Sequence, residues 1–167
     1  SQQPTIKELR HIMGQDAFKN PKDPAVLARL IDYVTLDGSI VLDFFAGSGT
    51  TGHAVLDLNR KANGQQRRSF QLVEMGEYFG KVTKPRIKKV LFSSKWNNGQ
   101  PEAEEGVQSL IKVQTLEQYE DVLDNLKTSW DEPALPEQVP VQYLYMPEKN
   151  KLTSSLDLSR PFVQTVR

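Results

Sequence analysis

The sequence predicts an α/β fold, and three neighbouring features lead to that prediction. Residues 39–42 form a short apolar run with β-branched side chains, which is typical of a buried strand. A turn containing glycine follows, and residues 51–58 then place apolar side chains at helical spacing. Residues 69–73 predict a second strand. A right-handed crossover through the intervening helix makes the two strands parallel.

The other elements follow in chain order. A helix over residues 5–13 ends at Gly14, because glycine accepts the left-handed conformation that often stops a helix. A second helix begins at Pro24, since proline suits the first helical turn. Residues 77–92 predict a helix that Pro85 kinks or breaks. The remaining expected elements are a loop over 59–68, a strand over 107–113, a helix over 116–126, a loop over 131–140 and a strand over 141–146.

Composition limits the class of protein. A chain of 167 residues suggests one domain, or one domain with a small appendage. It has no cysteine, so disulfides and thiolate metal sites are excluded and an intracellular compartment is expected. We expect no metal site around His11 or His53, and no apolar run is long enough to cross a membrane. Because Ser1 stands where an initiator methionine would, we expect a piece of a longer protein.

The zero net charge conceals an uneven distribution along the chain. Of the 21 basic residues 15 lie at or before Asn98, but only 9 of the 21 acidic residues do. We therefore expect two parts, residues 1–98 and a C-terminal extension over residues 99–167. A basic half favours an anionic partner, although two ordinary solvated surfaces explain the charges equally well.

The turn between the two strands is the most informative stretch. Residues 43–51 read Asp-Phe-Phe-Ala-Gly-Ser-Gly-Thr-Thr, and a strand, a glycine turn and a helix N-terminus together present free N–H groups to a bound molecule. Gly47, Gly49 and Gly52 also fit the G-x-G-x-x-G pattern, and Glu74 follows at about the 20-residue separation found in dinucleotide-binding proteins. An NAD-binding oxidoreductase domain is therefore one hypothesis.

The charge of Asp43 argues for a different ligand. A carboxylate at the end of the strand repels a pyrophosphate and attracts the ammonium group of a methionine moiety. Charge therefore favours S-adenosylmethionine over NAD. Glu74, at the end of the next strand, lies where an acid can accept hydrogen bonds from the ribose hydroxyls of an adenosine.

Three motifs resemble those of a known family. Residues 43–51 resemble motif I, the cofactor motif of amino-group DNA methyltransferases, and residues 18–22 (Phe-Lys-Asn-Pro-Lys) are similar to the motif X that precedes it in the β-class order. Glu74 resembles the acid of motif II. Further stretches resemble modification subunits of type III restriction systems, so the resemblance covers roughly residues 5–128; these stretches are residues 78–79, 85–90 and 117–121.

The resemblance implies a Rossmann-like S-adenosylmethionine-dependent methyltransferase fold, partial and mostly parallel, with flanking helices and a small α+β C-terminal extension. It implies the C-terminal part of a bacterial cytoplasmic enzyme that methylates adenine N6 in double-stranded DNA. A restriction subunit and a homodimer are the implied protein partners. The implied cofactor-binding residues are Phe18, Lys19, Asn20, Pro21, Asp43, Phe44, Phe45, Ala46, Gly47, Ser48, Gly49, Thr50, Thr51, Glu74 and Met75.

No catalytic residue is assigned. In the family an acid or asparagine followed by Pro-Pro-aromatic holds the flipped base, and this sequence contains no Pro-Pro pair. Asn20-Pro21 lacks the second proline and the aromatic residue, so it is interpreted as the start of a helix. Because β-class enzymes place the motif before motif X, we expect a fragment that is inactive by itself.

Two further hypotheses concern the surface. A run of basic residues after the second strand has the charge needed to neutralise DNA phosphates, although a solvated helix face explains it at least as well. The candidate DNA contacts are Lys84, Arg86, Lys88 and Lys89. Finally, residues 107–167 could instead form a non-catalytic interaction module, with the acidic helix near Asp121 as its support.

Overall fold

The computed structural model describes residues 4–63, 65, 67–103, 105–117, 119–124, 126–128, 140–143 and 162–165. The chain divides into two units, Ser1–Ser109 and Leu110–Arg167. Residues 99–109 belong to the first unit, where the Gly99 amide donates to the His11 carbonyl and the Val107 amide donates to the Leu91 carbonyl. The expected division after Asn98 stays a prediction.

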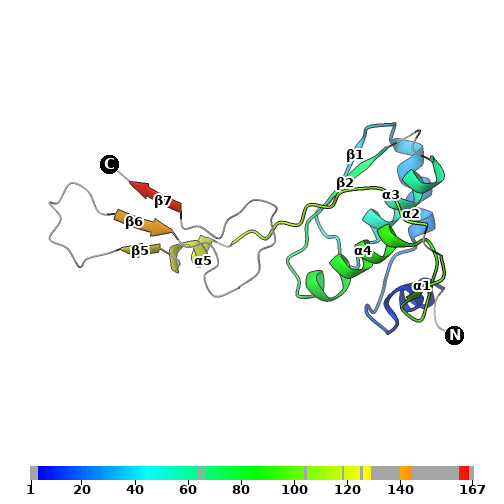
Figure 1. Cartoon of the computed structure of the whole chain (residues 1–167), viewed down its shortest axis with the longest axis horizontal. Helices are drawn as coiled ribbons and strands as arrows, with labels where there is room; N and C mark the ends of the chain where they lie inside the picture. The colour runs from blue at the N-terminus through cyan, green and yellow to red at the C-terminus, as the bar shows by residue number, and fades with distance from the viewer. Residues whose placement is uncertain are drawn as a thin grey trace. The chain divides into compact units, whose positions relative to one another are not determined.

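The first unit is an α/β structure, as the sequence predicted (Figure 1). β1 and β2 pair in parallel, with Ile40 opposite Ser69 and Asp43 opposite Leu72. The helix between them runs to Lys61, so the expected loop from residue 59 begins later. The elements of this unit are α1 Pro4–Met13, α2 Pro24–Val34, β1 Ile40–Asp43, α3 Thr50–Lys61, β2 Ser69–Leu72, η1 Phe79–Thr83, α4 Lys84–Phe92, β3 Trp96–Asn97 and β4 Gln100–Pro101.

The core lies between α2, α3 and one face of the parallel pair. Ala28 and Ile31 of α2 meet Ala54 and Val55 of α3, because each pair sits on the apolar stripe of its helix. Four partly buried side chains pack against this cluster: Leu27, Val41, Leu58 and Phe70. Side chains alternate along a strand, so the opposite face of β1 leaves Ile40 and Leu42 exposed.

Local signals place the helix ends. The Asp23 carboxylate accepts from the amides of Ala25 and Val26 at 2.8 and 3.3 Å, and Pro24 occupies the first turn of α2. Gly14 has a φ of 81°, and its amide donates to the Arg10 carbonyl at the end of α1.

The helix expected over residues 77–92 consists of two segments. A π-helical turn, η1, comes first, and α4 then begins at Lys84 with Pro85 in its first turn. Thr83 and Lys84 both have right-handed helical dihedrals, so η1 continues into α4 without a break. The helix type changes just before Pro85, which has no N–H to donate to the preceding turn, and the predicted kink stays a prediction.

The expected strand over residues 107–113 is wrong: described residues 105–117 form no regular element. The second unit contains α5 Tyr119–Asp124, within the helix expected over 116–126, and three antiparallel strands in the order β5-β6-β7. These are β5 Leu126–Thr128, β6 Pro140–Tyr143 and β7 Phe162–Thr165. β6 confirms part of the strand expected over 141–146, whereas residues 144–146 and 131–139 lie outside the described residues.

Within the described part of the chain, no helix combines the length and apolar character that a membrane span requires.

Candidate functional site

The loop of residues 44–49 joins β1 to α3 at the carboxyl ends of the parallel strands. Gly47 and Gly49 have φ values of 54° and 81°, a region that residues with a Cβ rarely adopt. A Cβ on Gly49 would also lie 3.3 Å from Thr83 Cγ2. The Gly49 amide donates to the Ala46 carbonyl at 2.7 Å, which closes a tight turn directly before α3. The two glycines are therefore required by the shape of the loop.

Asp43 fixes the start of this loop. One of its carboxylate oxygens accepts from the Phe45 amide at 3.0 Å, and the other accepts from the Thr51 hydroxyl at 2.6 Å. A carboxylate can accept about four hydrogen bonds, so acceptor positions remain beyond these two. Asp43 thus joins β1 to the first turn of α3, and its expected attraction for an ammonium group stays a prediction.

Glu74 connects the ends of the two strands. Its Oε2 atom accepts from the Gly47 amide and its Oε1 atom accepts from the Gly76 amide, each at 2.8 Å. The pKa of the nearby Tyr78 hydroxyl is raised, first by desolvation and second by the negative charge of Glu74. Glu74 therefore lies against the glycine loop, and its expected binding of ribose stays a prediction.

The segment before α2 also reaches the loop. The ring of Phe18 meets the ring of Tyr78 edge to face, with centroids 5.4 Å apart, and its Cζ lies 3.6 Å from where a Cβ on Gly47 would be. Phe18 and Lys19 also line a cleft of about 420 Å³, together with Ile6, Asp16 and Ala17. Of the other two predicted residues in this segment, Asn20 is exposed and Pro21 is buried.

Large apolar side chains near the loop face solvent. Phe45 is 88% exposed and Met75 is 92% exposed, and Phe44 is exposed as well. Leaving such side chains in water forfeits the free energy of burial, so they are available to a ligand that covers them.

The hydroxyls of the loop point the other way. Ser48 and Thr50 are buried, with their hydroxyl oxygens 3.1 Å apart, and the Thr50 hydroxyl also donates to the Lys22 carbonyl at 3.4 Å. Ala46 is buried too. Because these three side chains are buried, a ligand can contact little of these residues except their backbone groups. They instead hold the loop against the rest of the unit.

Arg86 differs from its predicted role at a DNA-binding surface. Its side chain is buried with 1% exposure, and one guanidinium nitrogen lies 2.9 Å from both the Ser48 and Thr50 hydroxyls. The helical period explains this position, because Val82, Arg86 and Val90 recur every four residues on one face of η1 and α4. The same spacing in the sequence would have indicated a buried arginine.

Lys89 also has internal partners. Its ammonium donates to the carbonyls of Ile12 and Gly99 at 2.9 and 3.0 Å and lies 4.5 Å from the centre of the Trp96 ring. Among the four basic candidates, Lys88 is exposed and Lys84 is partly buried. DNA contact by these two stays a prediction.

Metal binding finds no support among the described residues, where no group of three or more histidine, aspartate or glutamate side chains is arranged to hold an ion.

Comparison with known proteins gives a consistent set of matches. The type III restriction-modification enzyme StyLTI Mod subunit of Salmonella typhimurium is 45% identical over 60 residues, which cover 36% of this chain and 9% of that protein. The EcoPI Mod subunit of Escherichia phage P1 is 36% identical over 101 residues, which cover 52% of this chain and 15% of that protein. The type II methyltransferase M.KpnI of Klebsiella pneumoniae is 37% identical over 60 residues, which cover 36% of this chain and 14% of that protein.

The chain thus matches between 9% and 15% of the length of these relatives. No solved structure gives a significant match. Residues 2–84, which contain the glycine loop and Glu74, match the family model described as DNA methylase. The resemblance to DNA methylases that the motifs indicated is confirmed over residues 2–84.

Proposed function

We propose that this chain is the S-adenosylmethionine-binding part of an N6-adenine DNA methyltransferase, within the modification subunit of a type III system. The observation that carries the proposal is the glycine loop bracketed by two acids, Asp43 and Glu74, at adjacent carboxyl ends of parallel strands. In open α/β sheets ligands bind at this edge. The crossover through α3 supports a Rossmann-like arrangement for the whole domain.

The residues present fit the cofactor. The left-handed glycines leave the loop backbone free of Cβ atoms, so a ligand can approach it closely. Glu74 retains acceptor positions for the ribose hydroxyls, and the exposed Phe45 and Met75 can cover the flat apolar faces of an adenine. When bound, the cofactor supplies an electrophilic methyl group. The chain's own residues bind and orient it.

The alternative of an NAD-binding domain has less support. Gly52 completes the dinucleotide pattern, but a Cβ at this position would lie 2.7 Å from Ile87 Cδ1. Gly52 therefore serves the packing of α3 on α4, a role that does not depend on which cofactor binds. The matched family and the charge of Asp43 favour S-adenosylmethionine.

We propose that the remaining functions of the enzyme need other segments. The sequence has no Pro-Pro-aromatic motif to hold a flipped adenine, so the base-binding half of the site would come from elsewhere in the longer protein. Double-stranded DNA, a restriction subunit and a second modification subunit are the proposed partners. Lys84 and Lys88 are the candidates for contacting DNA phosphates.

Calorimetry with S-adenosylmethionine tests the cofactor assignment. We expect the chain to bind it and Glu74→Gln to weaken binding about tenfold, because an amide is a poorer acceptor for ribose hydroxyls than a carboxylate. Glu77→Gln is the matched control, since the Glu77 carboxylate is exposed and pairs with Lys81. Equal affinity of wild type and Glu74→Gln, or tighter binding of NAD, would contradict the assignment.

Methyl transfer from radiolabelled cofactor to mixed-sequence DNA tests the division of labour. We expect the 167-residue chain to transfer nothing while the full-length protein is active. Orientation of the target amine contributes up to about 10 kcal/mol of barrier reduction, which the cofactor half cannot supply alone. Sequence-specific turnover by the chain by itself would show that the catalytic residues lie within it.

A further inference from the structure

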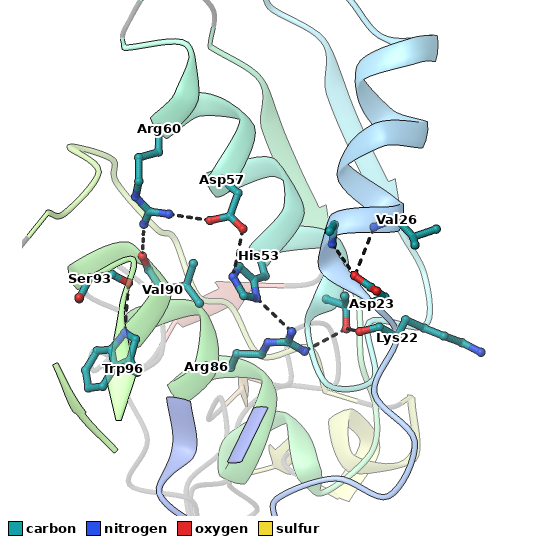
Figure 2. A network of polar contacts seen from close by, with 12 residues as sticks. Lys22, Asp23, Val26, His53, Asp57, Arg60, Arg86, Val90, Ser93 and Trp96 are labelled. Atoms are coloured by element: carbon teal, nitrogen blue, oxygen red, sulfur yellow. Dashed lines mark hydrogen bonds and ion pairs between the residues drawn. The ribbon is translucent and has the colours of Figure 1, made fainter. Parts of the chain in front are cut away.

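A network of polar contacts, buried at Arg86 and His53 and partly buried at Asp57 and Arg60, connects α3 to α4 (Figure 2). It begins at Arg86 of α4, whose Nη2 atom lies 3.0 Å from Nδ1 of His53 on α3. The Nε2 atom of His53 lies 3.2 Å from an Asp57 oxygen, and the other Asp57 oxygen accepts from Arg60 at 2.6 Å. Arg60 then donates to the Val90 carbonyl at 2.5 Å, one turn beyond Arg86.

This network of contacts fixes the tautomer of His53. A guanidinium can only donate hydrogen bonds, so Nδ1 of His53 must accept and the ring proton must reside on Nε2. That N–H then donates to Asp57, which is acceptor-only as a carboxylate. His53 is buried, and both of its ring nitrogens are used. The orientation of Arg86 is therefore set from α3 as well as by its own helix.

The charge of Arg86 is compensated from two elements. Burial lowers the pKa of Arg86 to about 10, while the negative charges of Glu8 on α1 and Asp57 on α3 act in the opposite direction. The guanidinium is therefore charged at neutral pH. A buried charge persists only where hydrogen bonds and opposite charges satisfy it. For Arg86, the contact with His53 and the charges of Glu8 and Asp57 are part of that compensation.

The Arg86 side chain and the turn that precedes α4 together contact Gly47 and Ser48 of the loop and Thr50 at the start of α3. The guanidinium contacts the Ser48 hydroxyl and the Thr50 hydroxyl, each at 2.9 Å. From η1, the Thr83 hydroxyl donates to the Gly47 carbonyl at 2.5 Å. These contacts reach the buried side of a loop whose two phenylalanine side chains are exposed. Their removal would free the loop without deleting a group that faces solvent.

We propose that Arg86 is a positioning residue for the glycine loop. Held by His53 and Asp57, its guanidinium fixes Ser48 and Thr50, so the loop N–H groups keep one geometry before a ligand arrives. This inference rests on the proposed cofactor function of the loop. A pre-organised loop avoids the ordering cost that a mobile one incurs on binding. Arg86 thus acts on affinity through the backbone of residues 44–49.

Arg86→Met and Lys89→Met form a matched pair of variants. Each removes one cation of α4 that has internal hydrogen-bond partners, but the Lys89 partners are carbonyls of Ile12 and Gly99. In the cofactor-free chain we expect Arg86→Met to raise amide hydrogen exchange of residues 44–50 about tenfold, and Lys89→Met to leave it unchanged. The affinity for S-adenosylmethionine should fall about tenfold in Arg86→Met alone, and Arg86→Lys should restore part of both effects.

Loop exchange tests the positioning role of Arg86, whereas the affinity for S-adenosylmethionine tests the proposed cofactor. Wild-type loop exchange in a folded Arg86→Met variant would overturn the positioning role, whether or not the chain binds the cofactor. Failure of the wild type to bind would count against the proposed cofactor and leave the exchange comparison valid. If Arg86→Met does not fold, His53→Gln gives the same test, with expected faster loop exchange and a loss of the ¹⁵N signature of the Nε2–H tautomer from the wild-type spectrum. Unchanged loop exchange in folded His53→Gln would equally overturn the proposal.

Discussion

The glycine loop has a buried side and an exposed side, and the two are built differently. On the buried side Ser48 and Thr50 meet the Arg86 guanidinium, and each of these two hydroxyls has partners within 3.1 Å. On the exposed side Phe45 and Met75 are almost fully solvated. The loop therefore carries its hydrogen-bonded polar side chains inward and its apolar ones outward, opposite to the usual distribution in a soluble protein.

The buried side of the loop should therefore contribute mainly to stability, and the exposed side mainly to ligand binding. Contacts on the buried side exist without any ligand, so changes there should alter the free energy of unfolding first and affinity as a consequence. Exposed apolar side chains contribute little to folding, but their burial under a ligand returns about 25 cal/mol for each Å² covered. Substitutions on the two sides should therefore affect different measurements.

We expect the largest effect from Arg86→Met on the buried side. Removing one member of a buried charged network leaves its partners unsatisfied, which costs about 3 kcal/mol or more of unfolding free energy. Ser48→Ala removes one neutral partner of the same guanidinium and should cost about 1 kcal/mol. Urea unfolding of the two variants measures the difference. Equal losses would mean that the guanidinium contributes no more than one ordinary hydrogen bond.

A comparison of two glycines tests how tightly the loop is packed. Gly49→Ala and Gly38→Ala both place a Cβ on a residue with positive φ, at 81° and 75°. A Cβ at Gly38 meets nothing within 4 Å, whereas one at Gly49 lies 3.3 Å from Thr83 Cγ2. We expect about 1 kcal/mol of lost stability at Gly38 and about 2 kcal/mol at Gly49, measured by urea unfolding. A smaller loss at Gly49 would indicate a loop that adjusts freely.

On the exposed side, Phe45→Ala should leave the unfolding free energy within about 0.5 kcal/mol of wild type, because the side chain is solvated. If the ring covers bound cofactor, affinity for S-adenosylmethionine should fall about tenfold. Tyr33→Ala, which removes an equally exposed ring from α2, is the control and should change neither quantity. Unaltered cofactor affinity in Phe45→Ala would remove this ring from the proposed site.

Sequence reasoning predicted the elements around the loop better than the contacts on its buried side. The strand, glycine turn and helix were correctly located from local signals, because glycine, proline and apolar spacing act over a few residues. Glu74 and Phe18 both lie near Gly47, and their roles in cofactor binding stay predictions. The expected strand over 107–113 was wrong, since alternation of residue types alone does not provide a partner strand.

Arg86 shows why the rest could not be predicted in the same way. The sequence contains a basic run after β2, and charge alone does not distinguish an exposed cation from a buried one. The four-residue spacing from Val82 to Val90 carried the missing information, but the partners of Arg86 lie 33 to 38 residues away along the chain. Such long-range pairings depend on how α3 and α4 pack, which no local pattern specifies.

The smallest effect that we expect concerns Glu8 of α1, an exposed residue whose charge acts on Arg86. Desolvation raises the pKa of Glu8 above its ordinary 4.5, although the positive charge of Arg86 opposes this. The neighbouring charges also include two carboxylates that raise it further, Asp57 and Asp23. The folded state therefore binds the Glu8 proton more tightly than the unfolded state does.

The sign of the pH dependence follows from that difference. The stabilisation linked to protonated Glu8 is fully present below the unfolded pKa and is lost as the pH rises through the folded pKa. Glu8→Gln stays neutral at every pH, so it should match wild type near pH 4 and exceed it at pH 7 by less than about 1 kcal/mol, since solvent screens this accessible side chain. Urea unfolding at the two pH values measures this, with Glu77→Gln as the control for net charge. A Glu8→Gln variant that is less stable than wild type at pH 7 would mean that attraction to Arg86 outweighs the cost of burying the carboxylate.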